Sequence, residues 1–283
     1  MKVTLSKPFG YCYGVMQAMS IASSAKKAHP NEGVYLLGTP VHNEEAIERL
    51  KKEGLILIDG DFAFLERSLL ALKEGSIVVF PAHGHPASFD EIARSKGFEI
   101  HDGTCAFVRD NIAAGLSSLK PVIYIGESHH SEKEAFLANC EGAYFIDAIS
   151  LEGDYASCPS SPLLIAQTTL SLLEMQKAVS KIKGIFPDAE IAKERCSSTR
   201  IRQERVAELS KSVDCAIVLG SKTSANSRNL LSIASLNCHS FLCLNEKEVA
   251  KLDLSSYRSV LVCSGASTEA STVNKTVSYL SSL

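Results

Sequence analysis

The chain has 283 residues, of which 45% are hydrophobic and 22% are charged, as is ordinary for a soluble globular protein with a substantial core. Its formal net charge of −3 gives no electrostatic reason to expect binding to nucleic acid or to an anionic membrane. No apolar run approaches the roughly 20 residues that cross a bilayer, and the N-terminus lacks the apolar segment of a signal peptide. We therefore expect a cytoplasmic protein without a nucleic-acid or membrane partner.

Short apolar segments alternate with amphipathic segments along the chain. Strands are predicted at residues 1–6, 34–37, 55–58, 78–80, 98–100, 122–125, 143–146, 163–166, 216–219, 241–244 and 260–263. Helices with one apolar face are predicted at residues 44–54, 170–186 and 198–213. In the last of these, Ile201, Val206 and Leu209 are expected to face inward, and Asn43 and Ser131 are expected to cap the helices that follow them. This alternation predicts an α/β fold with parallel-rich sheets and right-handed crossovers.

Three cysteines divide the chain at nearly equal intervals, because Cys105 lies 93 residues after Cys12 and 91 residues before Cys196. Each is expected at a junction between a strand and a helix. Each third of the chain also holds two longer strands with polar residues at their carboxyl ends, and a shorter strand between them. We interpret the chain as three copies of one small α/β domain related by pseudo-threefold symmetry. The predicted domains are residues 13–105, residues 106–195, and residues 196–283 together with 1–12.

The three cysteines form a candidate metal site. Thiols from three equivalent strand ends can meet on a pseudo-threefold axis, and three thiolates suit either zinc or a [4Fe–4S] cluster with one open coordination position. The alternative is that they pack in the core, as free cysteines often do. Equal spacing at strand ends favours the metal site. The other six of the nine cysteines are expected to be packed in the core rather than in disulfides.

Polar residues at the other strand ends are typical of an anion site. His42, His83 and His130 each stand between a predicted strand and a predicted helix. Residues of the last third in corresponding places are Ser224, Asn226 and Ser267. Imidazoles, hydroxyls, an amide and N–H groups at helix N-termini suit a phosphate or diphosphate, although a histidine at a helix N-terminus is also a common local hydrogen-bonding residue. The glycine-rich signatures of nucleoside triphosphate and dinucleotide sites are missing.

Two further residues are candidates for proton transfer. Glu132 follows His130 by two residues, so it can act as a general acid, or else serve as a first-turn charge favoured by the helix dipole. Thr168 can relay a proton or hold a substrate hydroxyl, or else cap the helix that begins near Leu170.

These residues resemble a known family, the 4-hydroxy-3-methylbut-2-enyl diphosphate reductases, also called LytB-type. The resemblance spans essentially the whole chain, and its motifs are in the order of that family. They are Phe9-Gly10-Tyr11-Cys12-Tyr13-Gly14-Val15, Val41-His42-Asn43, Ala82-His83-Gly84, Thr104-Cys105, His130-Ser131-Glu132, Gln167-Thr168-Thr169, the run from Gly220 to Ser227, and Gly265-Ala266-Ser267.

The resemblance implies three α/β domains around a central cavity and a [4Fe–4S] cluster held by Cys12, Cys105 and Cys196. It implies reductive dehydroxylation of 4-hydroxy-3-methylbut-2-enyl diphosphate to isopentenyl and dimethylallyl diphosphate, the last step of the methylerythritol phosphate route. A ferredoxin or flavodoxin is the implied electron donor. The implied catalytic residues are Glu132, Thr168 and His130. The implied substrate-binding residues are His42, His83, His130, Gln167, Thr168, Ser224, Ala225, Asn226 and Ser267.

The chain departs from the family pattern at a few positions. Ala225 stands where the family usually has a second serine, and Tyr11 and Tyr13 replace the usual residues beside Cys12. Gly103 and Ala106 likewise replace the usual residues around Cys105. Two alternatives therefore remain: a paralogue that acts on another anionic alcohol, which Ala225 favours, and a non-catalytic iron–sulfur or zinc sensor. The sensor has no need of Glu132 or Thr168.

Overall fold

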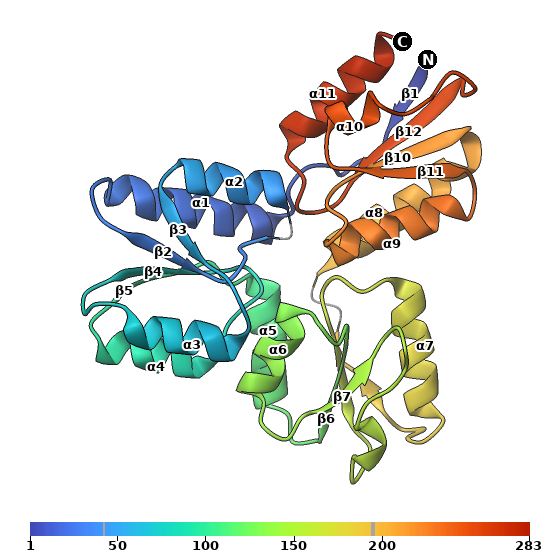
Figure 1. Ribbon diagram of the computed structural model, residues 1–283. Helices are drawn as coiled ribbons and strands as arrows, with labels where there is room; N and C mark the ends of the chain where they lie inside the picture. The colour runs from blue at the N-terminus through green and yellow to red at the C-terminus, as the bar shows by residue number, and fades with distance from the viewer. Residues whose placement is uncertain (42, 194–195) are drawn as a thin grey trace. The chain divides into compact units, whose positions relative to one another are not determined.

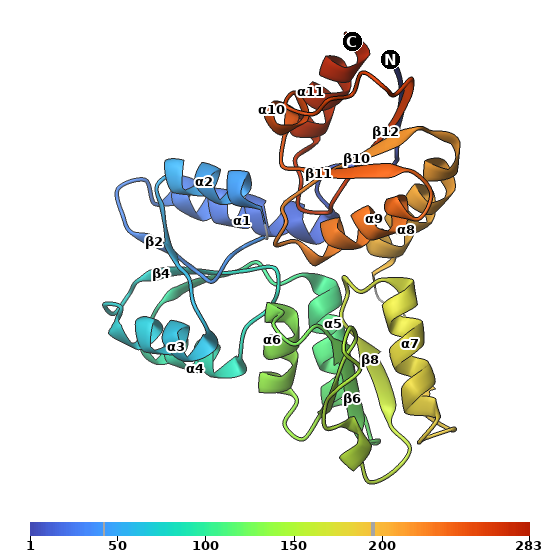
Figure 2. The same ribbon diagram turned by 45° about the vertical axis from the view of Figure 1, so that its right-hand side comes forward.

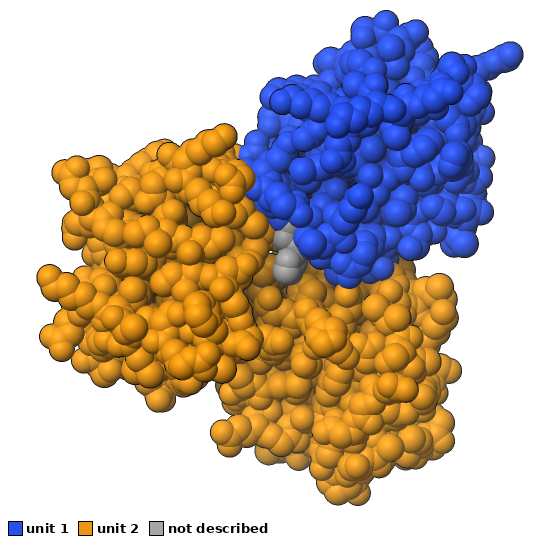
Figure 3. Space-filling view, viewed as in Figure 1, with its two compact units in different colours: residues 1–13, 42–46, 196–283 blue, residues 14–41, 47–195 orange. Residues whose placement is uncertain are grey.

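The computed structural model describes residues 1–41, 43–193 and 196–283, which form two compact units. Unit 1 comprises residues 1–13, 42–46 and 196–283, and unit 2 comprises residues 14–41 and 47–195 (Figure 3). None of the helices in these described stretches is long and apolar enough to span a membrane.

Unit 1 holds one four-stranded parallel sheet in the order β1-β12-β10-β11 (Figure 1). The strands are β1 (Lys2–Leu5), β10 (Cys215–Leu219), β11 (His239–Cys243) and β12 (Ser259–Ser264). The helices are α8 (Ser197–Leu209), α9 (Ala225–Ser235), α10 (Glu246–Val249) and α11 (Ala270–Ser281). Alternate residues of β10 face opposite ways, so Ala216 and Val218 pack with α8 and α9, whereas Ile217 and Leu219 pack with α10 and α11.

Unit 2 holds two further parallel sheets, β3-β2-β4-β5 and β7-β6-β8-β9 (Figures 1 and 2). The strands are β2 (Val34–Leu37), β3 (Leu55–Ile58), β4 (Ile77–Phe80), β5 (Glu99–Asp102), β6 (Val122–Gly126), β7 (Tyr144–Asp147), β8 (Leu163–Ala166) and β9 (Glu190–Ile191). The helices are α1 (Tyr13–Ala28), α2 (Glu44–Lys52), α3 (Phe62–Ala71), α4 (Ala87–Ser95), α5 (Ala106–Leu116), α6 (Ser131–Asn139) and α7 (Leu172–Lys183), and the first residues of α1 and α2 belong to unit 1.

Helices cover both faces of each sheet in unit 2. In both views α1 and α2 lie on one side of the first sheet, and α3 and α4 lie on the other (Figures 1 and 2). In the second sheet α6 packs on one face through Phe136, and α7 packs on the opposite face through Ala178 and Ile182. Strands covered on both faces are uniformly apolar, as β6 and β10 are.

All three sheets have the same internal order. In each, the first strand (β2, β6 or β10) lies between the second strand (β3, β7 or β11) and the third strand, and a fourth strand pairs at the edge beside the third. That edge strand is β5, β9 or β1, and each is followed within a few residues by Cys105, Cys196 or Cys12. The predicted α/β fold with three repeated parallel sheets is therefore confirmed. The domain boundaries and the central cavity stay predictions.

Several local predictions differ from the structure. Strand β9 was not predicted, because Glu190 and Ile191 form an exposed two-residue edge with no apolar pattern. Ile201 is 37% exposed, whereas Arg202 and Gln203 are buried, so α8 does not follow the apolar stripe expected of it. The cap of α6 is His130 rather than Ser131, because His130 Nδ1 accepts the Glu132 N–H. Asn43 does cap α2, with Oδ1 3.0 Å from Ala46 N.

Candidate functional site

In unit 2 the candidate residues gather around the carboxyl group of Glu132, which is buried in the first turn of α6. Its Oε1 accepts the Thr168 N–H at 2.9 Å, and its Oε2 accepts the Thr168 hydroxyl at 2.7 Å. The hydroxyl of Tyr124, on β6, donates to Oε1 at 3.3 Å. Glu132 therefore points into the unit rather than serving as an exposed helix charge.

The environment of Glu132 changes its protonation. Burial raises the pKa of Glu132 to about 7, and the hydrogen bonds from Thr168, Tyr124 and Asn111 only partly oppose that effect. The neutral and ionised forms are then both populated near neutral pH. A group with this pKa can both hold and release a proton, as a general acid must.

The position of Thr168 excludes its structural alternative. The helix that follows, α7, is capped by Ser171, which forms a reciprocal capping box with Glu174. Thr168 is thus not the cap, and its hydroxyl bonds to Glu132. The neighbouring Gln167 is buried, with its side-chain oxygen bonded to the Glu127 N–H and its side-chain nitrogen to the Thr169 hydroxyl. These bonds hold the loop, and contact of Gln167 with substrate stays a prediction.

Two predicted histidines lie together in the same unit. The rings of His83 and His130 are perpendicular, with centroids 5.4 Å apart. Because His130 Nδ1 accepts the Glu132 N–H at 3.1 Å, the proton of the neutral ring is on Nε2. His130 is therefore oriented as a hydrogen-bond donor through Nε2.

Cys105 stands at the N-terminus of α5, and its N–H donates to the Ala82 carbonyl next to His83. Its Sγ also packs against the start of α1, because a Cβ added to Gly14 would lie only 2.5 Å from that sulfur. Gly14 follows Cys12 by two residues in the sequence. A side chain at position 14 would thus displace the Cys105 thiol.

In unit 1 the candidate anion-binding residues begin helix α9. Ser224 is the cap of this helix, with its Oγ 3.4 Å from Ser227 N. Asn226, in the first turn, is only 3% exposed, and within the described parts of the chain neither its Oδ1 nor its Nδ2 has a hydrogen-bond partner. A buried amide of this kind is costly unless a ligand or water satisfies it. The adjacent Ala225 is buried as well.

Two glycines bring the ends of β10 and β12 close to α9. A Cβ at Gly220 would lie 2.1 Å from Ser227 Oγ, and a Cβ at Gly265 would lie 2.2 Å from it. Glycine is therefore required at both strand ends for Ser227 to fit between them. Ser267, the remaining candidate in this unit, is buried two residues after Gly265.

Cys12 and Cys196 also belong to unit 1, and each lies directly before a helix, α1 or α8. The buried Arg202 of α8 interacts electrostatically with both thiols, while burial lowers the pKa of its guanidinium. Its nitrogens donate to the carbonyls of Pro8 at 3.1 Å, Gly10 at 2.8 Å and Ser264 at 3.2 Å. Arg202 thus ties the loop before Cys12 to the helix that begins after Cys196.

Five of the remaining cysteines, Cys140, Cys158, Cys215, Cys243 and Cys263, are buried. Cys238 is partly exposed like Cys12, Cys105 and Cys196, and its Sγ donates to the Ala234 carbonyl near the end of α9. Burial raises the pKa of Cys215 and Cys263 to about 12, so these thiols stay protonated. The prediction that these six pack in the structure is consistent with their positions.

The structure thus brings together Glu132, Thr168, His130 and His83 in unit 2, and Ser224, Ala225 and Asn226 in unit 1. His42 lies outside the described residues. Sequence reasoning missed Tyr124, Asn111 and Arg202. The first two lie within ordinary strand and helix patterns, but an arginine six residues after Cys196 in an otherwise amphipathic segment was a usable signal.

Comparisons with known proteins agree along the whole chain. The model of the LytB protein family matches residues 3–281. A 4-hydroxy-3-methylbut-2-enyl diphosphate reductase of Lysinibacillus sphaericus is 32% identical over 293 residues, covering 99% of this chain and 88% of the relative. The protein of the same name from Bacillus cytotoxicus is 31% identical, covering 99% of this chain and 90% of the relative.

Solved structures agree with this assignment. The E-1-hydroxy-2-methyl-but-2-enyl-4-diphosphate reductase of Plasmodium falciparum is similar with a TM-score of 0.86 and 25% identity, covering 99% of this chain and 88% of that one. An (E)-4-hydroxy-3-methyl-but-2-enyl diphosphate reductase, described as the terminal enzyme of the non-mevalonate pathway, has a TM-score of 0.71 and 25% identity with full coverage of both chains. The chain therefore belongs to the LytB protein family.

Proposed function

We propose that this protein is a 4-hydroxy-3-methylbut-2-enyl diphosphate reductase of the methylerythritol phosphate route. The observation that carries the proposal is the match over residues 3–281 to a family whose curated relatives have that name. Each turnover consumes two electrons and two protons: the C–O bond of the allylic alcohol breaks, one proton leaves in water with that oxygen, and the other adds to the allyl skeleton. The products are isopentenyl and dimethylallyl diphosphate.

The diphosphate is bound by the residues at the start of α9. The unsatisfied amide of Asn226 and the Ser224 cap lie where N–H groups and the helix dipole favour an anion. Ser267 adds a hydroxyl, and Gln167 is a further predicted contact. His42, His83 and His130 are assigned to the same diphosphate from their sequence positions, with the Nε2–H of His130 as a donor.

The cofactor is a [4Fe–4S] cluster with Cys12, Cys105 and Cys196 as its three cysteine ligands. Three observations support the fit: these cysteines are partly exposed, each stands directly before a helix, and Arg202 places a positive charge near two of them. Gly14, whose missing side chain leaves room for the Cys105 sulfur, follows Cys12 by two residues in the sequence. When bound, such a cluster would supply single electrons and Lewis-acid chemistry.

The catalytic residues are Glu132, Thr168 and His130. In the structure the Thr168 hydroxyl donates to Glu132 Oε2. When the carboxyl is protonated this hydrogen bond reverses, so Glu132 donates to the Thr168 hydroxyl, which passes its own proton to the substrate oxygen. Tyr124 and Asn111 hold the carboxyl in place for this transfer. His130 donates to the diphosphate and, through Nδ1, positions the backbone of Glu132.

The electrons come from a small iron–sulfur or flavin protein, a ferredoxin or flavodoxin, since the chain contains no nicotinamide or flavin signature of its own. All nine cysteines are free, which supports a reducing compartment, the cytoplasm, as the place of the reaction.

A second candidate function is reduction of another anionic alcohol by the same cluster. Ala225 favours it, because a buried alanine at the start of α9 offers no hydroxyl to the anion. Loss of one hydrogen bond to a charged group costs about 1.5–3 kcal/mol of binding free energy. The two candidates therefore differ in substrate and share the mechanism.

An anaerobic assay tests the proposed function. Iron-loaded protein is mixed with reduced methyl viologen and 4-hydroxy-3-methylbut-2-enyl diphosphate, and oxidation of the dye is followed together with formation of the two products. We expect turnover with two electrons used per substrate. Fully loaded protein that oxidises no dye with this substrate contradicts the proposal, and activity on another phosphorylated allylic alcohol then supports the second candidate.

A matched pair of variants isolates the proton donor in the same assay. Glu132→Gln keeps the shape of the buried side chain but removes its acidic proton, so kcat is expected to fall about 10²–10⁴-fold with little change in KM. Glu134→Gln, two residues along the same helix and partly exposed, serves as the control and keeps the activity. Equal activity of both variants removes Glu132 from the proton path.

A further inference from the structure

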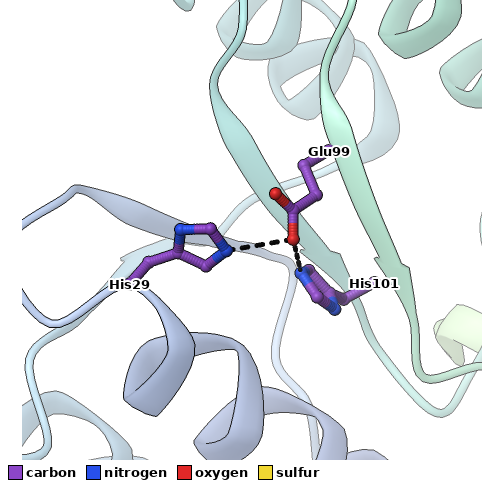
Figure 4. Close-up of side chains that lie close together, drawn as sticks. All are labelled: His29, Glu99 and His101. Atoms are coloured by element: carbon purple, nitrogen blue, oxygen red, sulfur yellow. Dashed lines mark hydrogen bonds and ion pairs between the residues drawn. The ribbon is translucent and has the colours of Figure 1, made fainter.

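A group of nitrogen and oxygen donors lies on the surface of unit 2, on the segment after α1 and on strand β5, which ends three residues before Cys105. His29 follows α1, whereas Glu99 and His101 stand two residues apart on β5 and so face the same side of that strand. Figure 4 shows both imidazole rings turned toward the carboxylate of Glu99.

The donor atoms are close enough to share one ion. The Oε1 of Glu99 is 3.0 Å from His29 Nε2 and 2.8 Å from His101 Nε2, and one ligand atom of each residue lies within 4.8 Å of the others. In a tetrahedral zinc site with bonds of about 2.0–2.1 Å, neighbouring ligand atoms are about 3.3 Å apart. The group therefore needs only small side-chain movements to surround a metal ion.

A fourth residue orients the first imidazole. Glu32 Oε1 lies 3.0 Å from His29 Nδ1, so the nitrogen facing away from the group is held by a carboxylate. This arrangement of carboxylate, imidazole and metal is the usual support of a histidine ligand. The loop carrying His29 is also held, because the Lys26 ammonium group donates to the carbonyls of Pro30 at 3.2 Å and Glu32 at 2.7 Å.

The exposure of the group suits an ion that exchanges with solvent. The side chains of His29 and His101 are 20% and 26% exposed, and that of Glu99 is 49% exposed. The ligands are thus partly fixed by packing, and water can reach the remaining coordination positions. Two imidazoles and one carboxylate are the donor set of an open zinc site.

We propose that His29, Glu99 and His101 form a binding site for a divalent transition-metal ion such as Zn²⁺, with Glu32 positioning His29. The bound ion joins the segment after α1 to strand β5 through side chains that are 70 residues apart in sequence. Binding to the folded state alone then stabilises unit 2 against unfolding.

Zinc titration of the anaerobically purified, iron-loaded protein tests this site. Wild-type protein is expected to bind one more Zn²⁺ per chain than His101→Asn and Glu99→Gln, as measured by calorimetry after removal of free metal. Zinc that binds to thiols adds equally to the number of ions bound by the wild type, His101→Asn and Glu99→Gln, so it does not affect the difference between them. His239→Asn, which removes an exposed histidine of unit 1, is the control and keeps the wild-type stoichiometry.

Thermal unfolding gives a second, independent measurement. Zinc is expected to raise the Tm of wild-type protein and of His239→Asn, and to leave the Tm of Glu99→Gln unchanged. A cooperative unfolding transition in the presence of a chelator shows that a variant is folded without zinc. If His101→Asn does not fold, Glu99→Gln alone is compared with the wild-type protein. Equal zinc stoichiometry and equal Tm shifts in wild type and Glu99→Gln overturn the proposal.

Discussion

At the scale of single residues, burial and hydrogen bonding set the chemistry of Glu132. The carboxyl is enclosed by α6, β6 and the loop after β8, and desolvation outweighs the donors that favour its charge. The sequence placed Glu132 and Thr168 after two different strands, and the contact between them is explained by the carboxyl ends of parallel strands meeting at one edge of a sheet. The hydrogen bond from Tyr124 to Glu132 was not predictable, since a tyrosine within the apolar strand β6 looks in the sequence like any other core residue.

The raised pKa of Glu132 predicts a pH-dependent stability. In the unfolded chain the group titrates near 4.5 and in the folded protein at about 7, so its contribution to stability is fully present below pH 4.5 and is lost as the pH rises through 7. Relative to Glu132→Gln, wild-type protein should lose about 3 kcal/mol of unfolding free energy between pH 4.5 and 8. Urea unfolding at several pH values measures this difference, with Glu134→Gln as the control. A difference between wild type and Glu132→Gln that is constant with pH contradicts the assignment.

The unsatisfied amide of Asn226 predicts a binding defect rather than a folding defect. Asn226→Ala should raise KM for the diphosphate about 10–100-fold, since a hydrogen bond to a charged group contributes about 1.5–3 kcal/mol. The same change should not lower the free energy of unfolding, because the amide has no partner within the described residues. Asn274→Ala, on the exposed face of α11, is the control. An unchanged KM with lowered stability shows a structural role instead.

At the scale of elements, the starts of the helices were predicted better than their faces. The helix start at residue 44 was predicted from Asn43 and the apolar residues that follow it. The inward face of α8 was wrong at Ile201, because the buried Arg202 and Gln203 replace an apolar stripe with polar contacts to backbone carbonyls. Such a network depends on residues far away in sequence, which periodicity does not reveal.

We therefore expect that lysine cannot substitute for arginine at position 202. Arg202→Lys keeps the charge but loses the fork that reaches three carbonyls, so unfolding free energy should fall by about 3 kcal/mol, and iron should dissociate faster. Arg205→Lys, whose partner is the exposed Glu208, should change stability by less than about 1 kcal/mol. Denaturant unfolding and iron retention measure both. Equal behaviour of the two variants argues against a positioning role for Arg202.

The close approach of α9 to the strand ends predicts a compensating pair. Gly265→Ala should lower the free energy of unfolding by about 1–3 kcal/mol, because its Cβ meets Ser227 Oγ at 2.2 Å. In the double variant with Ser227→Ala the nearest remaining atom of residue 227 is Cβ, at 3.5 Å, so most of the loss should be recovered. Ser227→Ala should restore less of the unfolding free energy that Gly220→Ala loses, since the Cβ at position 220 would still lie 2.9 Å from the Cβ of residue 227. Additive effects of Gly265→Ala and Ser227→Ala contradict this geometry.

At the scale of the whole molecule, the three cysteines at equal intervals were the strongest signal in the sequence. They predicted three copies of one small α/β domain, each with its cysteine after a strand, and each cysteine does follow the edge strand of its sheet. Strand β9 was not predicted, because its two residues are exposed and too few to show an alternation of apolar and polar residues. The central claim that remains to be measured is that one thiol from each repeat holds a single [4Fe–4S] cluster.

Mössbauer spectroscopy of protein loaded with iron-57 tests that claim most directly. Wild-type protein should show four irons per chain in a three-to-one pattern, with the single iron changed by the diphosphate substrate. Cys105→Ser should lose this signal, whereas Cys238→Ser, which alters a partly buried cysteine outside the proposed ligands, should keep it. A full four-iron signal that persists in Cys105→Ser, or four equivalent irons that ignore the substrate, contradicts the account.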